Sequence, residues 1–274
     1  MEEHLTGQRQ GFAYGYTAIT DIGEHNKDTG IAFGILSLRA GESLSEMTEH
    51  ESAYLLLSGR IELSVEGKTE QYARASLFDE GPCCVHVPCK TLVSLHAFED
   101  TELAIQRVKN EKRFPVEWYG PRDVANENRG AGQVDGACWR WVRTIFDDRN
   151  SSPDAELVLG EVVTMPGRWS SYPPHHHPQP EIYHYRFSDP RGFGNAQLGE
   201  DVVLVRQYDT VKILDEKDHA QCAAPGYAMY YVWVIRHLPA CRYSIPEFTE
   251  DHRWTMEPDA EFWLPEKEHA HGKA

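Results

Sequence analysis

The sequence predicts an all-β fold made of two related β-barrels. Short runs rich in β-branched and aromatic residues recur along the chain, and turn residues bound each run. Helical periodicity nowhere extends over more than about ten residues. A strand, a glycine turn, a second strand and a long apolar strand follow one another on both sides of a polar stretch at residues 110–137. Many short strands at this spacing are typical of sandwiches and barrels.

The expected strands fall into corresponding segments of the two halves. They are 31–44, 54–72, 83–98 and 101–108 in the first half, and 156–167, 181–188, 201–214 and 227–235 in the second. Segment 54–72 is expected to contain two strands, because Ser58-Gly59 would interrupt it and Glu66-Gly67 would close it.

The polar stretch at 110–137 is expected to connect the two barrels. It contains Pro115, Pro121 and four glycines, and its polar and apolar residues hardly alternate. The expected domains are an N-terminal barrel at 1–112, a linker at 113–137, a C-terminal barrel at 138–264 and a solvated tail at 265–274.

Charge and composition exclude several classes of partner. The 274 residues include 27 Lys and Arg against 43 Asp and Glu, a net charge of −16. Nucleic acids and anionic membranes need a basic surface, so neither is expected as a partner. No stretch approaches the roughly 18–20 apolar residues that cross a bilayer, and no secretory signal is visible. The six dispersed cysteines indicate reduced thiols and a cytoplasmic protein.

The segment SYPPHHHPQPEIYHY, residues 171–185, gives the clearest indication of chemistry. Its four prolines exclude a helix, so the segment must be extended or turning. Residues two apart in an extended chain share a face, which places His175 and His177 together and turns His176 away. Glu181 then opens the next strand. Two imidazoles and a carboxylate at a rigid turn suit a divalent cation, whereas the alternative is a histidine loop in contact with water alone.

A metal site of this kind needs another ligand from elsewhere in the fold. The candidates are His184, His219, His237 and His252. Strand alternation points His184 away from the face that carries Glu181. We favour His219, because it lies between the strand pair at 201–214 and the last apolar strand.

The strand that begins at Glu181 also supplies candidates for catalysis and substrate binding. Alternation puts Tyr183 and Tyr185 on the Glu181 face, as substrate contacts or proton relays, with barrel-filling aromatics as the alternative. Arg186 could pair with a substrate carboxylate, but alternation turns it away from the metal, and a surface salt bridge is the alternative. Tyr230 is a further candidate for substrate contact.

Several blocks resemble the bicupin uronate isomerases of myo-inositol and pectin breakdown. They are SAYLLLSGRIELSVEG, ARASLFDEGPCCVHVP, NENRGAG, GEVVTMPGRWSSYPPHHH, EIYHYRF, GFGNAQ and AAPGYAMYYVWV, within a likeness that runs from about Gly34 to Trp254. The resemblance implies a bicupin, two jelly-roll β-barrels in one chain. It implies one divalent metal ion, Zn, Mn or Fe, held by His175, His177, Glu181 and His219, and a polar substrate contact from Gln197.

The same resemblance implies isomerisation of 5-deoxy-glucuronate, an aldose, to 5-dehydro-2-deoxy-gluconate, a ketose. The expected partner is a small sugar acid, and association into homo-oligomers is left open. The N-terminal half has no counterpart of His-x-His, since His50-Glu51 lacks a partner, so we expect a metal-free barrel there. Three alternatives remain: an isomerase of a related deoxy-keto-uronate, a cupin dioxygenase using Fe(II), and a non-catalytic bicupin.

Overall fold

The computed structural model describes residues 2–265, and its regular structure is almost entirely β-strand. Within that range, ten strands precede residue 120: β1 His4–Leu5, β2 Gly15–Thr20, β3 Ile31–Leu38, β4 Ser43–Met47, β5 Glu51–Val65, β6 Lys68–Arg74, β7 Cys84–Val87, β8 Leu92–Ala97, β9 Thr101–Val108 and β10 Glu117–Tyr119. The other described strands are β11 Glu127–Arg129, β12 Arg140–Phe146, β13 Leu157–Thr164, β14 Trp169–His176, β15 Glu181–Phe187, β16 Phe193–Leu198, β17 Asp201–Arg206, β18 Thr210–Ile213, β19 His219–Ala223, β20 Met229–Arg236 and β21 Glu247–Phe248. A 3-10 helix, η1, spans Glu250–Met256. The predicted all-β class is confirmed.

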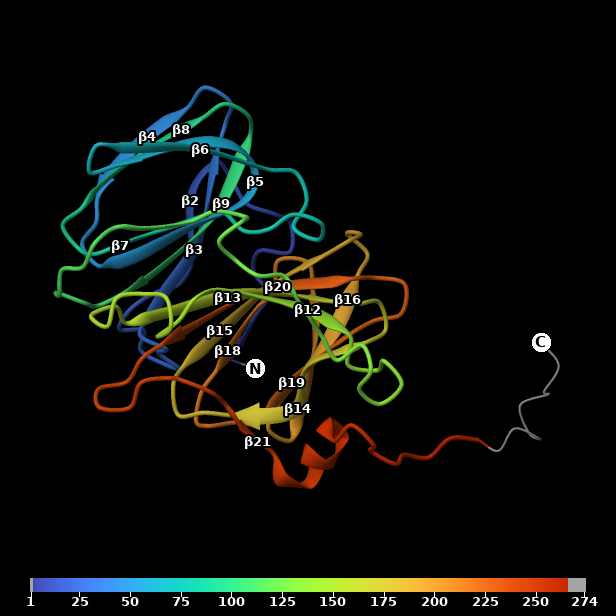
Figure 1. Cartoon of the computed structure of the whole chain (residues 1–274). Helices are drawn as coiled ribbons and strands as arrows, with labels where there is room; N and C mark the ends of the chain where they lie inside the picture. The colour runs from blue at the N-terminus through green and yellow to red at the C-terminus, as the bar shows by residue number, and fades with distance from the viewer. Residues whose placement is uncertain (1, 266–274) are drawn as a thin grey trace.

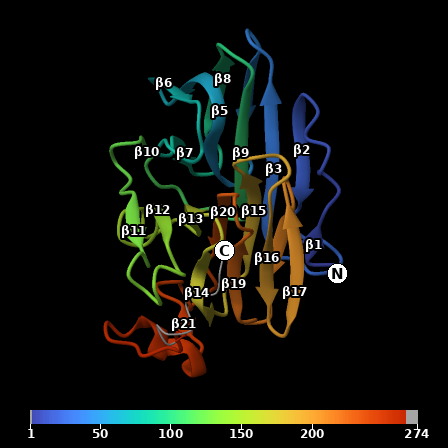
Figure 2. The same ribbon diagram turned by 90° about the vertical axis from the view of Figure 1, so that its right-hand side faces the viewer.

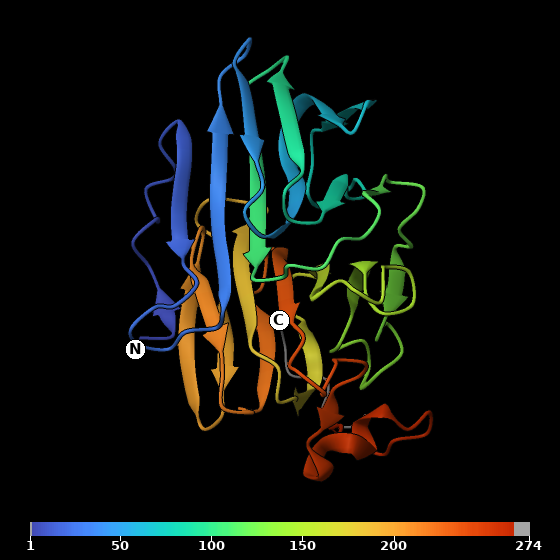
Figure 3. The ribbon, with the colours of Figure 1, turned by 90° about the vertical axis from the view of Figure 1, so that its left-hand side faces the viewer.

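The strands form two β-units, which Figure 1 shows one above the other. The N-terminal unit has the strand order β10-β7-β5-β9-β3-β2, and β6, β8 and β4 extend it into a second layer through β5. The C-terminal unit combines a sheet of order β1-β18-β15-β20-β13-β12-β11 with one of order β17-β16-β19-β14-β21. Figures 2 and 3 show from opposite sides that β1 lies with the C-terminal unit.

Three apolar cores follow from the alternation of side chains along the strands. On β5, Tyr54 faces the interior of the N-terminal unit, whereas Leu55 packs between the units. On β15, Tyr183 faces the interior of the C-terminal unit, whereas Ile182 packs between the units. Both faces of these central strands are therefore buried, and the sheets of the two units share one core.

Strand β5 differs from the expected interruption at Ser58-Gly59. It runs without a break from Glu51 to Val65, with a register shift between Leu56 and Ser58 in its pairing with β9. Gly59 has a φ of +94°, and a Cβ there would lie 2.5 Å from the Asp100 carbonyl oxygen. The glycine therefore bends the strand from one layer into the other, as glycines at bulges do, without ending it.

Three short segments, one at the start of the chain and two in the expected linker, form strands that pair with a sheet. Residues 4–5 in β1 pair with 210–211 in β18. Residues 117–119 in β10 pair with β7, and residues 127–129 in β11 pair with β12. The stretch 113–137 thus adds a short edge strand to each unit.

A buried carboxylate from each unit is bound by groups of the other. Glu161 is 0% exposed and accepts hydrogen bonds from Arg74 at 2.5 Å, Arg143 at 2.8 Å and the Tyr230 hydroxyl at 2.7 Å. Glu51 accepts hydrogen bonds from backbone N–H groups at the start of β13. Burial opposes ionisation of Glu161, but Arg74 outweighs it and lowers the pKa of that carboxyl. The two units are thus linked by a buried ion pair between Arg74 and Glu161 and by backbone hydrogen bonds to the buried Glu51.

The described part of the chain contains no helix that is long and apolar enough to span a bilayer. Its six cysteines are free thiols, and four of them are buried.

Candidate metal centre

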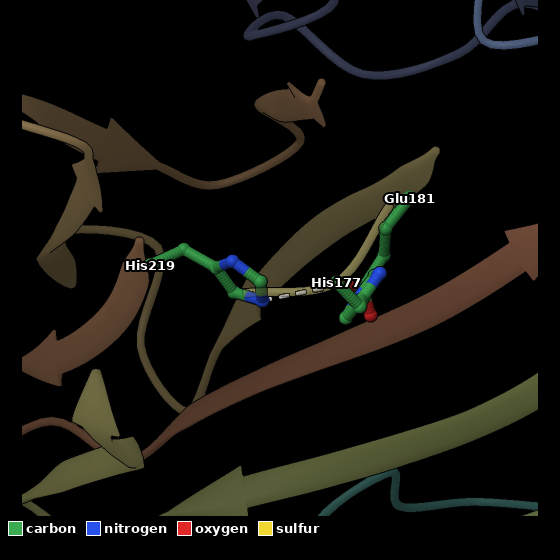
Figure 4. A group of neighbouring side chains, drawn as sticks. All are labelled: His177, Glu181 and His219. Carbon is green, nitrogen blue, oxygen red and sulfur yellow. Dashed lines mark hydrogen bonds and ion pairs between the residues drawn. The ribbon is translucent and has the colours of Figure 1, made fainter. Parts of the chain in front are cut away.

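Three buried side chains meet where β14, β15 and β19 come together. His177 lies in the turn after β14, Glu181 is the first residue of β15, and His219 is the first residue of β19. Glu181 Oε2 is 3.2 Å from His177 Nε2 and 3.3 Å from His219 Nε2 (Figure 4). The nearest donor atoms of all three lie within 4.8 Å of one another, a spacing at which they could hold a metal ion.

The rings are oriented so that their Nε2 atoms face the cluster. His177 Nδ1 donates a hydrogen bond to the Gln179 carbonyl at 2.9 Å, and His219 Nδ1 donates to the Lys217 carbonyl at 3.0 Å. Such contacts fix the tautomer and leave Nε2 as a ligand atom. Among the described residues, the buried Nε2 of His219 has no partner in hydrogen-bond geometry, although it lies close to Glu181. This unsatisfied nitrogen is what a bound cation would satisfy, so the residues fit a metal ion.

The carboxylate of the cluster is ionised. Burial alone would raise the pKa of Glu181, but the neighbouring His177 and His219 outweigh it and lower the pKa to about 2. An anionic oxygen between imidazoles is a donor set suited to Zn, Mn or Fe.

The fourth predicted ligand, His175, lies beside this cluster without joining it. His175 pairs across the strands with His219, and the two ring centroids are 4.2 Å apart. Its Nδ1 donates to the Ser171 carbonyl at 3.2 Å, and its nitrogens lie outside the three-residue group. Burial and then the neighbouring His219 lower the pKa of His175 well below its usual range. His175 is thus a neutral imidazole next to the cluster.

The other histidines considered as ligands, and His176, lie away from the cluster. His176 points away and binds Asp218 at 2.8 Å, which confirms the prediction from alternation. His184 lies on the opposite face of β15, where its Nδ1 donates to Thr210 and its Nε2 accepts from Arg186. His237 Nδ1 accepts the Tyr243 N–H, and His252 is exposed.

A cavity of about 930 Å³ opens onto the cluster. His175, Glu181 and Tyr183 contribute to its wall, and residues 243–248 with part of η1 cover one side. Tyr185 shares the inward face of Tyr183, but its hydroxyl donates to Gln221 at 2.7 Å and it is not part of the cavity wall. Of the two predicted catalytic tyrosines, the structure brings only Tyr183 to the cavity.

The three predicted substrate contacts lie elsewhere. Arg186 and Tyr230 are cross-strand partners that face the N-terminal unit, where Arg186 binds Glu102 at 3.3 Å and Tyr230 binds Glu161. Gln197 donates to the Gly199 carbonyl at 3.1 Å. None of the three belongs to the cavity wall. The expected surface position of Arg186 is also wrong, because the N-terminal unit buries the outer face of β15.

Sequence reasoning missed the arginines of the cavity, which are Arg129, Arg140, Arg149 and Arg253. Arg140, Val142 and Thr144 are alternate residues of β12, so their side chains lie on the same face, and all three line the cavity. This alternation was the one local sign that Arg140 faces inward. No motif distinguishes it from the other 26 lysines and arginines of the chain.

Fold and site together define a cupin-like protein with a histidine–carboxylate cluster in its C-terminal unit. The structure resembles a Cupin 2 conserved barrel domain protein from Leptotrichia buccalis, with a TM-score of 0.53 and 12% identity, over 85% of this chain and 95% of that one. It resembles an IolB-like protein from Salmonella typhimurium LT2 more closely, with a TM-score of 0.77 and 25% identity, over 89% of this chain and 96% of that one.

Residues 5–255 match the KduI/IolB family, and the chain belongs to that family. A protein named 5-deoxy-glucuronate isomerase from Geobacillus kaustophilus is 29% identical over 245 residues, which cover 83% of this chain and 86% of the relative. Another of that name from Halalkalibacterium halodurans is 26% identical over 271 residues, covering 91% and 97%. The resemblance to uronate isomerases is confirmed.

Proposed function

We propose that this protein is a metal-dependent aldose–ketose isomerase that converts 5-deoxy-glucuronate to 5-dehydro-2-deoxy-gluconate. The observation that carries the proposal is the buried group of His177, Glu181 and His219, which opens through Glu181 onto a cavity large enough for a sugar acid. Relatives named 5-deoxy-glucuronate isomerase support the choice of substrate.

One divalent ion, Zn, Mn or Fe, is proposed to bind His177, Glu181 and His219, with His175 as the fourth ligand after a small movement of its ring. When bound, the ion would supply Lewis-acid polarisation of a carbonyl and the neighbouring hydroxyl, which acidifies the C–H of the carbon that carries the hydroxyl. The ionised Glu181 offsets the charge of the ion, and the carbonyl partners of His177 and His219 keep both rings aimed inward.

A row of hydroxyl groups is proposed to receive the sugar oxygens. The Tyr183 hydroxyl lies 3.3 Å from Ser171 Oγ, which lies 3.1 Å from the Tyr231 hydroxyl. Tyr231 in turn donates to Ser170 Oγ at 3.0 Å. Burial raises the pKa of Tyr183 well above its usual value, so its hydroxyl remains a hydrogen-bond donor. Tyr183 is therefore the proposed substrate contact, at the end of this row that opens onto the cavity.

The test is to purify the protein, determine its metal content by elemental analysis, and follow 5-deoxy-glucuronate by NMR while oxygen is monitored. We expect about one metal ion per chain, formation of the ketose, and no oxygen consumption. Removal of the metal with a chelator should stop the reaction, and adding the ion back should restore it. Oxygen uptake coupled to substrate loss would indicate a dioxygenase, and undiminished turnover by metal-free protein would refute the proposal.

A further inference from the structure

The cavity contains one arginine whose charge no neighbouring carboxylate neutralises. Three of its four arginines form ion pairs with residues close in sequence: Arg129 with Glu127 at 2.6 Å, Arg149 with Asp147 at 2.7 Å and Arg253 with Glu250 at 2.9 Å. In the described part of the chain, Arg140 has no carboxylate within 4.0 Å. Its charge is therefore available to a ligand in the cavity.

Arg140 is held with one edge of its guanidinium occupied and the other open. Nη1 donates to the Cys138 carbonyl at 2.8 Å and lies 3.5 Å from the Gln133 side-chain oxygen. Nε and Nη2 donate to none of the residues that the structure describes. Burial lowers the pKa of Arg140, yet a guanidinium stays protonated at neutral pH. The open Nε–Nη2 edge is a pair of parallel donors that matches a carboxylate.

The chain makes room for this arrangement at Gly130. This glycine has a φ of +71°, and a Cβ at that position would lie 2.5 Å from Arg140 Nη1. The turn at Gly130 thus lets the backbone pack against the guanidinium and fix its orientation. A side chain there would displace Arg140.

We infer that Arg140 binds the carboxylate of the sugar acid and makes the cavity selective for acids over neutral sugars. The identity of the acid rests on the proposed function, whereas the preference for a negative charge rests on Arg140 itself. Arg140 and Glu181 line the same cavity, so an acid bound at Arg140 has its remaining length available to the histidine–carboxylate cluster. The global charge of −16 makes such a local cation necessary for an anionic ligand.

The test compares glucuronate with its neutral counterpart glucuronamide by calorimetric titration of the metal-loaded protein. Wild type should bind glucuronate more tightly than glucuronamide. Arg140→Gln should lose about 10–100-fold in affinity for the acid and little for the amide, because one charged hydrogen-bond partner is removed. Arg140→Lys should retain part of the preference, since it keeps the charge and loses the fork. Arg149→Gln, which removes a paired arginine of the same wall, should have a much smaller effect.

Metal content and thermal unfolding of each variant should match wild type. If wild type does not prefer the acid, or if Arg140→Gln and Arg140→Lys leave the preference unchanged, the inference is wrong. Equal loss for acid and amide would also refute it. Turnover of 5-deoxy-glucuronate separates this inference from the proposed function. If Arg140→Gln turns over this substrate with an unchanged KM, the role of Arg140 is refuted and the isomerase activity is not. If wild type binds the acid selectively but does not turn over 5-deoxy-glucuronate, the proposed isomerase function is refuted and the role of Arg140 is not.

Discussion

The two units share one arrangement of central strands and differ at the mouth of the barrel. β9 lies between β3 and β5 in the N-terminal unit, as β20 lies between β13 and β15 in the C-terminal unit. In the pairing of β5 with β9, Ser52 lies opposite Arg107, whereas at the corresponding place in the other unit Glu181 lies opposite Ile235. The carboxylate that belongs to the proposed metal centre is thus replaced by a hydroxyl in the N-terminal unit.

The hairpins beside these strands differ in the same sense. His175 pairs with His219 between β14 and β19, whereas Glu46 pairs with Val93 between β4 and β8. Glu46 is bound by the Arg107 guanidinium at 2.9 Å and by the Tyr54 hydroxyl, next to a smaller cavity of about 440 Å³. An arginine of the chain neutralises this carboxylate, whereas Glu181 faces two imidazoles. A few side chains therefore decide which unit is suited to an ion, and we propose that the N-terminal unit binds none.

The largest expected effect comes from His177→Ala, which removes an imidazole from the unit suited to metal. We expect loss of the metal and at least about a 10³-fold fall in turnover, because the buried, ionised Glu181 loses a partner and the ion loses a ligand. The fold should persist, since the apolar cores do not include His177. Elemental analysis, NMR turnover and circular dichroism measure these outcomes.

The control for that variant is His176→Ala. His176 is partly exposed and binds Asp218 on the other side of the strand, so its loss should change metal content and turnover by no more than about twofold. Strong metal loss in His176→Ala, or wild-type turnover in His177→Ala, would contradict the assignment of the ligand face.

The second effect concerns the contact between the units. Glu161→Gln leaves Arg74 and Arg143 buried without a counter-charge, so we expect the free energy of unfolding to fall by about 3–5 kcal/mol. Urea unfolding followed by fluorescence measures this change. Glu127→Gln breaks an exposed pair with Arg129 and should cost less than about 1 kcal/mol. Equal midpoints for the two variants would mean that the buried cluster does not hold the units together.

The third effect separates two neighbouring tyrosines. Tyr183→Phe removes a hydroxyl at the cavity wall and should lower kcat by about tenfold or more. Tyr185→Phe removes a hydroxyl that donates to Gln221 inside the barrel, so kcat should stay within about threefold while stability falls by about 1 kcal/mol. Steady-state kinetics of both variants decide the matter. A larger loss of kcat in Tyr185→Phe would show that the reaction uses the interior of the barrel.

The smallest effect tests the N-terminal unit directly. Arg107→Met leaves Glu46 with the Tyr54 hydroxyl alone and should lower the free energy of unfolding by about 1–2 kcal/mol, without changing metal content or kcat. Thermal unfolding and elemental analysis measure the two quantities. A loss of metal in this variant would indicate an ion in the N-terminal unit. It would contradict the proposal that only the C-terminal unit binds metal.

The alternation of side chains along extended strands made many of the side-chain orientations at the candidate site predictable. The opposite orientations of His176 and His177, and of Ile182 and Tyr183, follow from the period of an extended strand, which is a property of the chain itself. His219 was predicted from its place between the strand pair at 201–214 and the last apolar strand, and the family resemblance implied the same residue. What alternation does not tell is whether the other face of a strand meets solvent or a second sheet. Arg186 shows this, since the N-terminal unit covers the face of β15 that carries it.

Arg140 illustrates the other kind of information that the sequence lacked. Each paired arginine of the cavity has its carboxylate two or three positions away in sequence, and Arg140 has none so near. That these four arginines line one cavity is what the sequence does not tell. The sequence also does not tell the partner of Glu46, because Arg107 is distant along the chain. Pairing between charges that are distant along the chain is a property of the assembled fold, so it could not be predicted from spacing.

The anchoring of the first residues has a consequence for how the chain is made. Arg9 reaches the buried Asp209 with two hydrogen bonds, at 2.7 and 2.6 Å, across 200 positions of sequence, and His4 binds the same carboxylate at 2.8 Å. A ribosome that adds about 5–20 residues per second needs roughly 10–40 s to synthesise that interval. During that time the leading segment has no docking site, so it must wait in the nascent protein until the last third of the chain emerges, and a truncated transcript would leave it permanently unattached.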